Sequence, residues 1–359
     1  MAAVLGSTVM VAAKRCIGRV ARGVSLALVT GTLAACMQDQ GSVTLIVRTD
    51  LPEVVRDYVK ETFEAVHQDT DVRFTIASTK TTLVELQAIE LQGGPPFDVW
   101  WGAHASGLQA ASDEGRLMTY QPRWLGRSAA VDLQYDGEWH PLLLTPYVIA
   151  FSRGDLELAR APSDWIDLRH FQWSDDIEIL DPSRSEAGEW FLISMLQQAA
   201  SMGDLESGFD WLSTIDRYVE SYATNTSDAL QALREKRSRL AIVPRADVEL
   251  ARSKNSPWLY YRLPESGTPV LVRGVALMNG TKEAGAAQAF LDHLGSIDVR
   301  TETKLRTRWQ PVFGTVDSSR IPVGFELQEP WAPFAIPFDT IQGKREGWLD
   351  RWEQEIRVR

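Results

Sequence analysis

The chain has 359 residues and a formal net charge of −11, with 37 lysines and arginines against 48 aspartates and glutamates. So acidic a chain lacks the basic face that neutralises phosphates, and this excludes a nucleic acid from the expected partners. The length predicts two packed units rather than one small core.

The first 35 residues are predicted to be a secretory signal peptide and not part of the fold. A basic segment without acids (residues 14–22) precedes a short apolar run (24–29). The sequence LAAC at residues 33–36 then resembles a bacterial lipobox, in which Cys36 is lipidated and becomes the first mature residue. The alternatives are a non-lipidated signal cleaved nearby, with Cys36 an incidental thiol, and a signal that starts at Met10.

The mature protein is therefore expected outside the cytoplasm, periplasmic or at the cell surface, and anchored to the membrane through Cys36. Residues 36–42 form a polar tether. The second cysteine, Cys16, lies in the signal, so no disulfide is expected. No stretch after Cys36 reaches the roughly 20 apolar residues that a membrane-spanning helix needs.

Three strand–helix units follow the tether. Apolar strands are predicted at residues 43–47, 72–77 and 97–101, and each is followed by a segment with helical spacing of its apolar residues. Such an alternation indicates an α/β fold with a parallel sheet, in which ligands bind beyond the carboxyl ends of the strands.

The stretch 97–106 is the most informative of these units. An apolar strand breaks at Gly102, and Ser106 is expected to cap the next helix with Gln109 as its partner. Free backbone N–H groups at Gly102, Ala103 and His104 are therefore predicted to form one wall of a ligand cleft. The two tryptophans at 100 and 101 point to opposite sides of the strand, so one could face this cleft.

The character of the chain changes after residue 152. A long apolar strand at 142–151 is interrupted by Pro146, which suits a crossover between lobes better than a central ladder position. A second α/β unit follows, with strands at 177–180 and 240–243. The strand at 269–278 crosses back, and a last helix near 340–356 carries Trp348 and Trp352 on one face. The sequence leaves open whether this helix packs on the first lobe or meets a partner.

The order of these parts resembles an extracellular solute-binding protein of an ABC importer, with the type 2 periplasmic-binding fold. The segments that carry the resemblance are residues 45–63, 98–102 (DVWWG), 145–152, 165–168, 180–185 and 274–277. It is most similar to the branch with ferric-iron, 2-aminoethylphosphonate and phosphoglycerate-type binding proteins.

The resemblance implies an α/β fold of two lobes, joined by hinge crossovers near residues 142–151 and 263–274, that close on one ligand. Lobe 1 would comprise residues 43–145 and 271–359, and lobe 2 residues 146–270. The implied partners are a small-molecule ligand and the permease subunits in the membrane. A monomer without a cofactor is expected.

Ferric-binding members carry adjacent tyrosines after the strand equivalent to residues 240–243, where this chain has Arg245. The pair Tyr260 and Tyr261 falls inside a later strand, and alternation sends its side chains to opposite faces. An arginine suits a carboxylate or phosphate better than a metal ion. The sequence therefore favours a small anionic ligand: a phosphonate, a phosphate ester or a carboxylate.

Candidate site residues follow predicted strands or open predicted helices. They are Arg48, Thr49, Gly102, Ala103, His104, Tyr147, Ser183, Arg184, Ser185, Ser227 and Arg245. Several have plainer explanations. Thr49, Ser183 and Ser227 would serve as helix caps, and His104 could be a solvated loop residue. Tyr147 could simply pack the hinge.

The two arginines have alternatives as well. Arg184 could pair with Asp181 or Glu186, and Arg245 with Asp247 or Glu249. Lys80 follows the second strand at the edge of the cleft, and the sequence favours a position on the solvated surface for its side chain.

Catalysis has little support in the sequence. It contains no Gly-x-Ser-x-Gly, no His-Glu-x-x-His and no phosphate-binding loop, and its five histidines show no metal-ligand spacing. Three other functions stay open: a ligand sensor that feeds a membrane signalling kinase, a ferric-iron binding protein, and an exported hydrolase with unrecognised carboxylate chemistry.

Overall fold

The computed structural model describes residues 42–89, 94–126, 133–134, 137–323, 331–338, 341 and 343–357. The chain divides into two units, residues 1–40 and 41–359, and everything below concerns the second. The predicted signal peptide and Cys36 lie outside the described residues.

The first lobe is built on parallel strands at the start of the unit. Strand β1 (Val43–Thr49) pairs in parallel with both β2 (Thr70–Ile76) and β3 (Val99–His104). The strands are followed by α1 (Glu53–Val66), α2 (Thr79–Gln87) and α3 (Ala105–Asp113), and β4 (Leu117–Met118) comes next. The alternating α/β pattern read from the sequence is thus confirmed.

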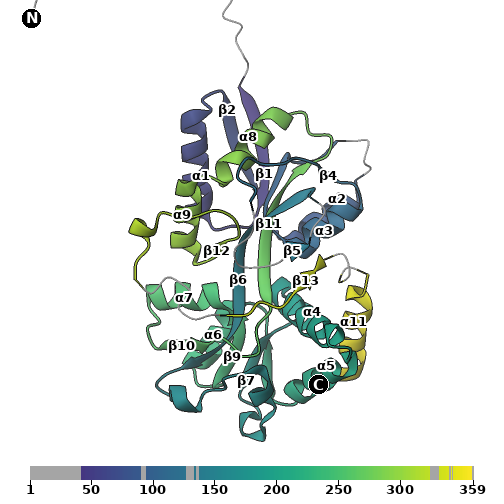
Figure 1. Cartoon of the computed structure of the whole chain (residues 1–359), viewed down its shortest axis with the longest axis vertical. Helices are drawn as coiled ribbons and strands as arrows, with labels where there is room; N and C mark the ends of the chain where they lie inside the picture. The colour runs from purple at the N-terminus through teal and green to yellow at the C-terminus, as the bar shows by residue number, and fades with distance from the viewer. Residues whose placement is uncertain are drawn as a thin grey trace, which may run out of the picture. The chain divides into compact units, whose positions relative to one another are not determined.

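Two long antiparallel strands run from the first lobe into the second (Figure 1). The first part of β6 (Trp139–Ser152) pairs with β11 (Val270–Met278) and β12 (Gln310–Pro311). From Tyr147 onward β6 pairs with β9 (Leu240–Pro244) and β10 (Leu259–Arg262). The change of partner falls at Pro146, a residue without a backbone donor.

The second lobe repeats the parallel arrangement. Strand β7 (Ile177–Leu180) lies between β8 (Val219–Ala223) and β9 and is parallel to both. Short 3₁₀ turns precede it at Leu158–Arg160, Trp165–Arg169 and Phe171–Trp173. Its helices are α4 (Glu186–Ser201), α5 (Leu205–Asp216), α6 (Thr226–Arg234) and α7 (Arg245–Lys254).

The part of the chain after β11 serves both lobes. Helices α8 (Ala284–Leu294) and α9 (Ile297–Thr307) contact α1 of the first lobe. Beyond a 3₁₀ turn at Ser318–Arg320, strand β13 (Ile336–Pro337) pairs with β5 (Leu133–Gln134).

The chain then enters α11 (Arg345–Arg351) and a π-helical turn, Trp352–Ile356, which pack on α4 and α5 of the second lobe. Assigning all of residues 271–359 to lobe 1 is therefore wrong for this last segment. Its apolar side chains explain the placement, because Trp348 and Trp352 are 7% and 2% exposed. The C-terminal helix therefore packs on the second lobe and not on the first.

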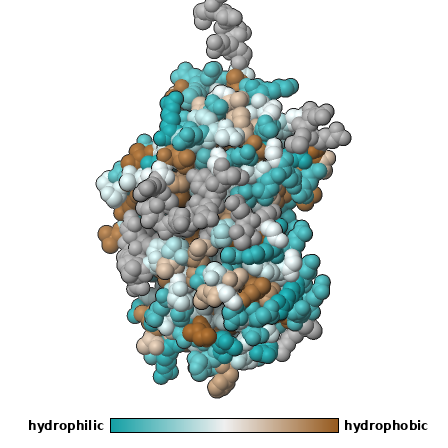
Figure 2. Space-filling model, turned by 45° about the vertical axis from the view of Figure 1, so that its right-hand side comes forward, coloured by the Kyte–Doolittle hydropathy of each residue, from teal (hydrophilic) through white to brown (hydrophobic). Residues whose placement is uncertain are grey.

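The two tryptophans of the strand predicted at residues 97–101 both belong to the hydrophobic core. Trp100 and Trp101 are both buried, at 1% and 2% exposure. The Trp101 ring packs edge-on against Phe290 of α8, and Trp100 contacts Phe97. Neither tryptophan is left to face a cleft. The face drawn in Figure 2 is mostly hydrophilic, with hydrophobic residues in small separate groups.

Candidate functional site

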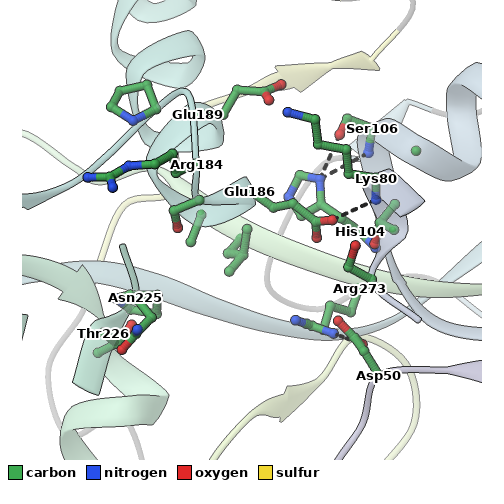
Figure 3. Close-up of a pocket in the computed structure, with 18 of the residues that line it drawn as sticks. Asp50, Lys80, His104, Ser106, Arg184, Glu186, Glu189, Asn225, Thr226 and Arg273 are labelled. Atoms are coloured by element: carbon green, nitrogen blue, oxygen red, sulfur yellow. Dashed lines mark hydrogen bonds and ion pairs between the residues drawn. The ribbon is translucent and has the colours of Figure 1, made fainter. Parts of the chain in front are cut away.

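A cleft of about 780 Å³ lies between the two lobes. The first lobe contributes side chains from the end of β1, from α2 and from α3; the second contributes the starts of α4, α6 and α7. Figure 3 shows these side chains facing one another across β11. Its polar and charged lining comprises Asp50, Ser78, Thr79, Lys80, Gln87, His104, Ser106, Ser183, Arg184, Ser185, Glu186, Glu189, Thr224, Asn225, Thr226, Asp247, Arg273, Thr307, Arg345 and Glu346.

Four helices that begin at this cleft, two from each lobe, have a side-chain N-cap in its lining. The residues that cap α2, α3, α4 and α6 are Ser78, His104, Ser185 and Asn225, and all four line the cleft. A helix start carries unpaired N–H groups and a partial positive charge, both of which favour an anion. The cleft is therefore surrounded by backbone that suits a negatively charged group.

Cationic side chains reach the same space, most of them paired with carboxylates. Arg273, in the middle of β11, pairs with Asp50, donates to the Gly102 carbonyl at 2.8 Å and lies over the Trp309 ring. Arg345 at the start of α11 pairs with Glu189 of α4. Because each guanidinium has five N–H donors, these pairs leave donors for a ligand.

One carboxylate crosses the cleft. Glu186, the first residue of α4, accepts a hydrogen bond from the backbone N–H of Lys80 in α2, with an N–O distance of 2.8 Å. The bond joins the second lobe to the first, and Figure 3 shows it. Burial is the main cause that raises the pKa of Glu186. The start of α2 thus already holds an acid group in this structure.

Two further titratable groups, the half-buried Asp247 and the buried His104, face the cleft. Asp247 of α7 accepts from the Thr226 hydroxyl at 2.9 Å, and burial raises its pKa. Burial, followed by the charges of Arg273 and Arg345, lowers the pKa of His104 to about 3, so the ring is neutral.

The His104 ring contacts Ser106 through its Nδ1. This atom lies 3.3 Å from the Ser106 backbone nitrogen and 2.7 Å from the Ser106 hydroxyl. The ring Nε2 is buried without a hydrogen-bond partner among the described residues. The position predicted to bind ligand therefore also caps α3, while Ser106, the expected cap, lies inside the helix.

Four of the predicted site residues line the cleft: His104, Ser183, Arg184 and Ser185. Ser185 caps α4 by accepting from the Gly188 N–H at 3.2 Å, a role that the sequence had assigned to Ser183. Arg184 donates from Nε to Asp181 at 2.8 Å, which is the pairing weighed as its alternative, and its side chain stays 55% exposed.

Two predicted residues at the end of β1 lie elsewhere. Arg48 pairs with Glu85 at 2.6 Å, donates to the Thr75 hydroxyl at 2.8 Å, and is not part of the cleft lining. Thr49 is fully buried and accepts from the Leu51 N–H at 3.1 Å instead of capping α1. Asp50, the next residue, is the one that reaches the cleft.

Gly102 and Ala103 continue β3 instead of forming a loop. Gly102 has φ +77°, and a Cβ there would lie 2.5 Å from the Leu51 side chain, so the position requires glycine. Ala103 is 2% exposed and pairs with Gly274 of β11. Neither residue lines the cleft, because the strand runs on to His104.

The three remaining candidates also fall outside the lining. Tyr147 is buried and donates to the Ala187 carbonyl at 2.6 Å, which ties β6 to the start of α4. Arg245 is 1% exposed and donates to the Tyr261 hydroxyl at 2.8 Å. Ser227 is exposed in the first turn of α6, and Asn225 is the cap.

Sequence reasoning missed several residues of the cleft. Lys80 lines it although it was assigned to the solvated surface. Arg273 could have been predicted from the sequence as a site residue, since it is a lone charge inside the apolar run VLVRGVALM. Arg345 had none, because only the folded chain brings α11 to α4.

Among the described residues, no group of three or more histidines, cysteines, aspartates or glutamates is arranged to hold a metal ion. Tyr260 and Tyr261 lie outside the cleft lining as well, and the second of them is engaged with Arg245. None of the described helices is both long and apolar enough to span a bilayer.

Comparisons with known proteins agree with this architecture. The chain is 26% identical over 279 residues to a probable ABC transporter periplasmic-binding protein, y4fP, of Sinorhizobium fredii, covering 74% of each chain. The fold is similar to that of the periplasmic binding protein AfuA from Actinobacillus pleuropneumoniae with fructose-6-phosphate bound (TM-score 0.72, 18% identity, 89% of this chain and 100% of that one).

Two further solved structures share the fold. Iron-bound HitA from Pseudomonas aeruginosa superposes with a TM-score of 0.71 at 16% identity, over 86% of this chain and 97% of that one. The ferric binding protein from Campylobacter jejuni gives 0.73 at 15% identity, over 86% and 98%. Residues 43–301 match the family described as bacterial extracellular solute-binding protein. The chain belongs to this family of solute-binding proteins.

Proposed function

We propose that the protein is the solute-binding component of an ABC importer, and that it captures a small acid-bearing ligand between its lobes and delivers it to the permease. The observation that carries the ligand class is the convergence of four capped helix starts with Lys80, Arg273 and Arg345 on one cleft. Backbone N–H groups and guanidinium forks together are the donors that carboxylates and phosphates take.

The acids of the cleft narrow the ligand further. Asp247 and Glu186 are half-buried and bind neutral donors, so a ligand with hydroxyl or amino groups would give them better partners. A phosphonate, a phosphate ester or a carboxylate that also carries such donors fits the cleft better than a bare anion. Relatives whose structures hold fructose-6-phosphate or iron mark the two ligand chemistries to be compared.

Hinge closure is the proposed mechanism. The two lobes share the continuous strands β6 and β11, and the ladder changes partners around Pro146 and Val270. We place the hinge there. Lobe 1 then comprises the chain before residue 146 and the chain after residue 270, except for the last segment, α11 and the turn Trp352–Ile356, which packs on lobe 2. A ligand that contacts both lobes favours the closed state by its differential affinity for that state.

Export and anchoring complete the proposal. The basic and apolar leader and the LAAC sequence support a signal peptide and a lipid on Cys36. The protein would then act as a monomer at the membrane surface, as a binder without catalytic activity. Mass spectrometry of the mature N-terminus tests this: a diacylated or triacylated Cys36 is expected, and cleavage at another residue would contradict it.

Calorimetry tests the ligand class. The unlipidated chain from residue 37 would be titrated with inorganic phosphate, glycerol 3-phosphate, 2-aminoethylphosphonate, 3-phosphoglycerate, citrate and ferric iron. Saturable one-to-one binding of a hydroxyl- or amino-bearing acid is expected. Tight binding of ferric iron with no response to any organic acid would contradict the proposal.

A further inference from the structure

The loop that enters the cleft from the second lobe is organised around one buried carboxylate. Asp181 follows β7 and is fully buried. One of its oxygens accepts from the Ser183 N–H at 2.9 Å and from the Ser183 hydroxyl at 2.7 Å. The other accepts from Arg184 Nε at 2.8 Å. Because Ser183 and Arg184 line the cleft, Asp181 fixes where their side chains lie.

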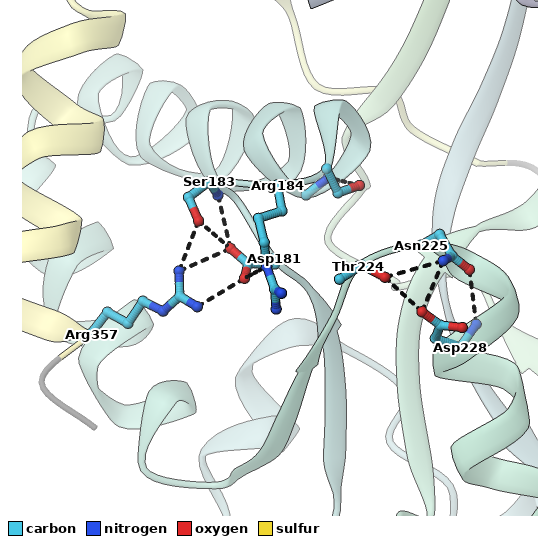
Figure 4. A network of polar contacts seen from close by, with 9 residues as sticks. Asp181, Ser183, Arg184, Thr224, Asn225, Asp228 and Arg357 are labelled. Carbon is cyan, nitrogen blue, oxygen red and sulfur yellow. Dashed lines mark hydrogen bonds and ion pairs between the residues drawn. The ribbon is translucent and has the colours of Figure 1, made fainter. Parts of the chain in front are cut away.

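The remaining partner of this carboxylate comes from the far end of the chain. Arg357 binds both oxygens of Asp181, with Nη1 at 3.0 Å and Nη2 at 2.8 Å, and Nη1 also donates to the Ser183 hydroxyl at 2.9 Å. Figure 4 shows the Arg357 guanidinium approaching from the side opposite Arg184. A bidentate arginine–carboxylate pair fixes orientation as well as charge.

Aromatic rings hold Arg357 in place. Its guanidinium lies 5.1 Å from the centroid of Tyr222 and 5.4 Å from that of Trp352. Burial raises the pKa of Asp181, but the hydrogen bonds from Ser183, Arg184 and Arg357 outweigh it, and the pKa falls below its ordinary value. The carboxylate is therefore charged at neutral pH and remains bound to this arginine.

We propose that Arg357 is a positioning residue for ligand binding: it orders the loop 181–185 and thereby the start of α4 at the cleft. The same terminal segment reaches the cleft directly, since Arg345 and Glu346 line it. This segment lies beyond residues 43–301, the part that matches the family model. The effect on affinity rests on the proposed function, whereas the effect on the loop does not.

A matched pair of variants separates positioning from plain packing. Arg351, one and a half turns earlier on the same segment, pairs with Glu206 at 2.6 Å and lies over Phe209, away from the cleft. Arg357→Ala and Arg351→Ala each remove a bidentate ion pair from the terminal segment, on the buried Asp181 in the first case and on the exposed Glu206 in the second. Thermal unfolding of both variants would confirm that each is folded.

Hydrogen–deuterium exchange without ligand is the primary readout. In Arg357→Ala the backbone amides of residues 183–188 should exchange on the order of 10-fold faster, because a charge-assisted ion pair that orders the loop is lost. Arg351→Ala should leave them unchanged, and Arg357→Lys should restore part of the protection. Equal exchange in the two alanine variants, or no change in Arg357→Ala, would overturn the proposal.

Calorimetry with glycerol 3-phosphate adds the functional readout. The dissociation constant is expected to rise about 10-fold in Arg357→Ala and to stay unchanged in Arg351→Ala. An equal rise in both would overturn the positioning role. If the unaltered protein binds no glycerol 3-phosphate, inorganic phosphate or 2-aminoethylphosphonate, the ligand class proposed above fails, and the exchange result alone decides on Arg357.

Discussion

Arg273 illustrates how one residue organises the centre of the cleft. It is the charge inside an otherwise apolar strand, and it connects Asp50, the Gly102 carbonyl and the Trp309 ring. Arg273→Gln keeps a polar group of similar size but leaves the Asp50 carboxylate without its ion pair. Because Asp50 is only partly buried, the free energy of unfolding is expected to fall by about 1 kcal/mol, the low end of the cost of a polar group left without its partner.

The same variant should weaken the binding of the best ligand in the calorimetric panel by about 10-fold or more, because a charge-assisted donor is lost. Arg48→Gln is the control, since Arg48 is also paired with a carboxylate, Glu85, but lies outside the cleft. Unchanged affinity in Arg273→Gln, or an equal loss in Arg48→Gln, would contradict the assignment.

Glu186 gives a prediction on pH. Burial raises the pKa of Glu186 in the folded protein above the ordinary value of 4.5, which applies to the unfolded chain. At a pH between the unfolded-state pKa and the folded-state pKa, the folded protein holds a proton that the unfolded chain has released. Stability must then fall as the pH rises through that window. Glu186→Gln removes the titration and keeps an oxygen that can accept the Lys80 N–H.

The variant should therefore unfold at a higher temperature than the original protein at pH 7, with the difference vanishing near pH 4. Thermal melts across this range measure it. A difference that is constant with pH, or one that grows as the pH falls, would contradict the account.

At the scale of elements, the contact between α4 and β7 sets the geometry of the cleft. A Cβ at Gly188 would lie 2.4 Å from the Leu180 carbonyl oxygen, a backbone atom that cannot move aside. Gly188→Ala should push the first turn of α4 away from β7 and cost about 1–3 kcal/mol.

Gly347→Ala is the matched control, because a Cβ there would meet nothing within 4 Å in α11. It should be neutral or stabilising by about 0.5–1 kcal/mol, as alanine favours the helix. Chemical denaturation of both variants checks the pair. Similar stability changes at the two glycines would refute the close packing of α4 on β7.

The elements were more predictable than the site, for a physical reason. Apolar runs such as residues 43–47 and 177–180 announce buried strands, and their alternation with helices fixes the α/β class. The residue at which a helix begins depends on single hydrogen bonds. The cap of α3 is therefore His104 and not the predicted Ser106, and the cap of α4 is Ser185 and not the predicted Ser183.

Long-range contacts were beyond reach of the sequence alone. Arg245 follows a strand, as a cleft residue would, but its guanidinium donates to the Tyr261 hydroxyl inside the second lobe. Arg345 gives no local signal and arrives at the cleft because α11 packs on α4. Strand pairing and burial decide such positions, and both join residues that are far apart in the chain.

In the unit of residues 41–359, the proposed function requires that two lobes close on one ligand. The shared strands β6 and β11 allow the lobes to turn without separating, and the hydrogen bond from Lys80 to Glu186 joins them in this structure. A ligand that contacts both sides should shift the lobes toward the closed state.

The most direct test measures the distance between the lobes by pulsed electron paramagnetic resonance. Spin labels would be placed at Asp57→Cys in α1 and Met202→Cys after α4, both exposed positions in a chain whose two cysteines precede residue 37. Saturation with the tightest-binding acid of the panel is predicted to narrow the distance distribution and shift it to shorter values. Saturable binding with an unchanged distribution would contradict closure on the ligand.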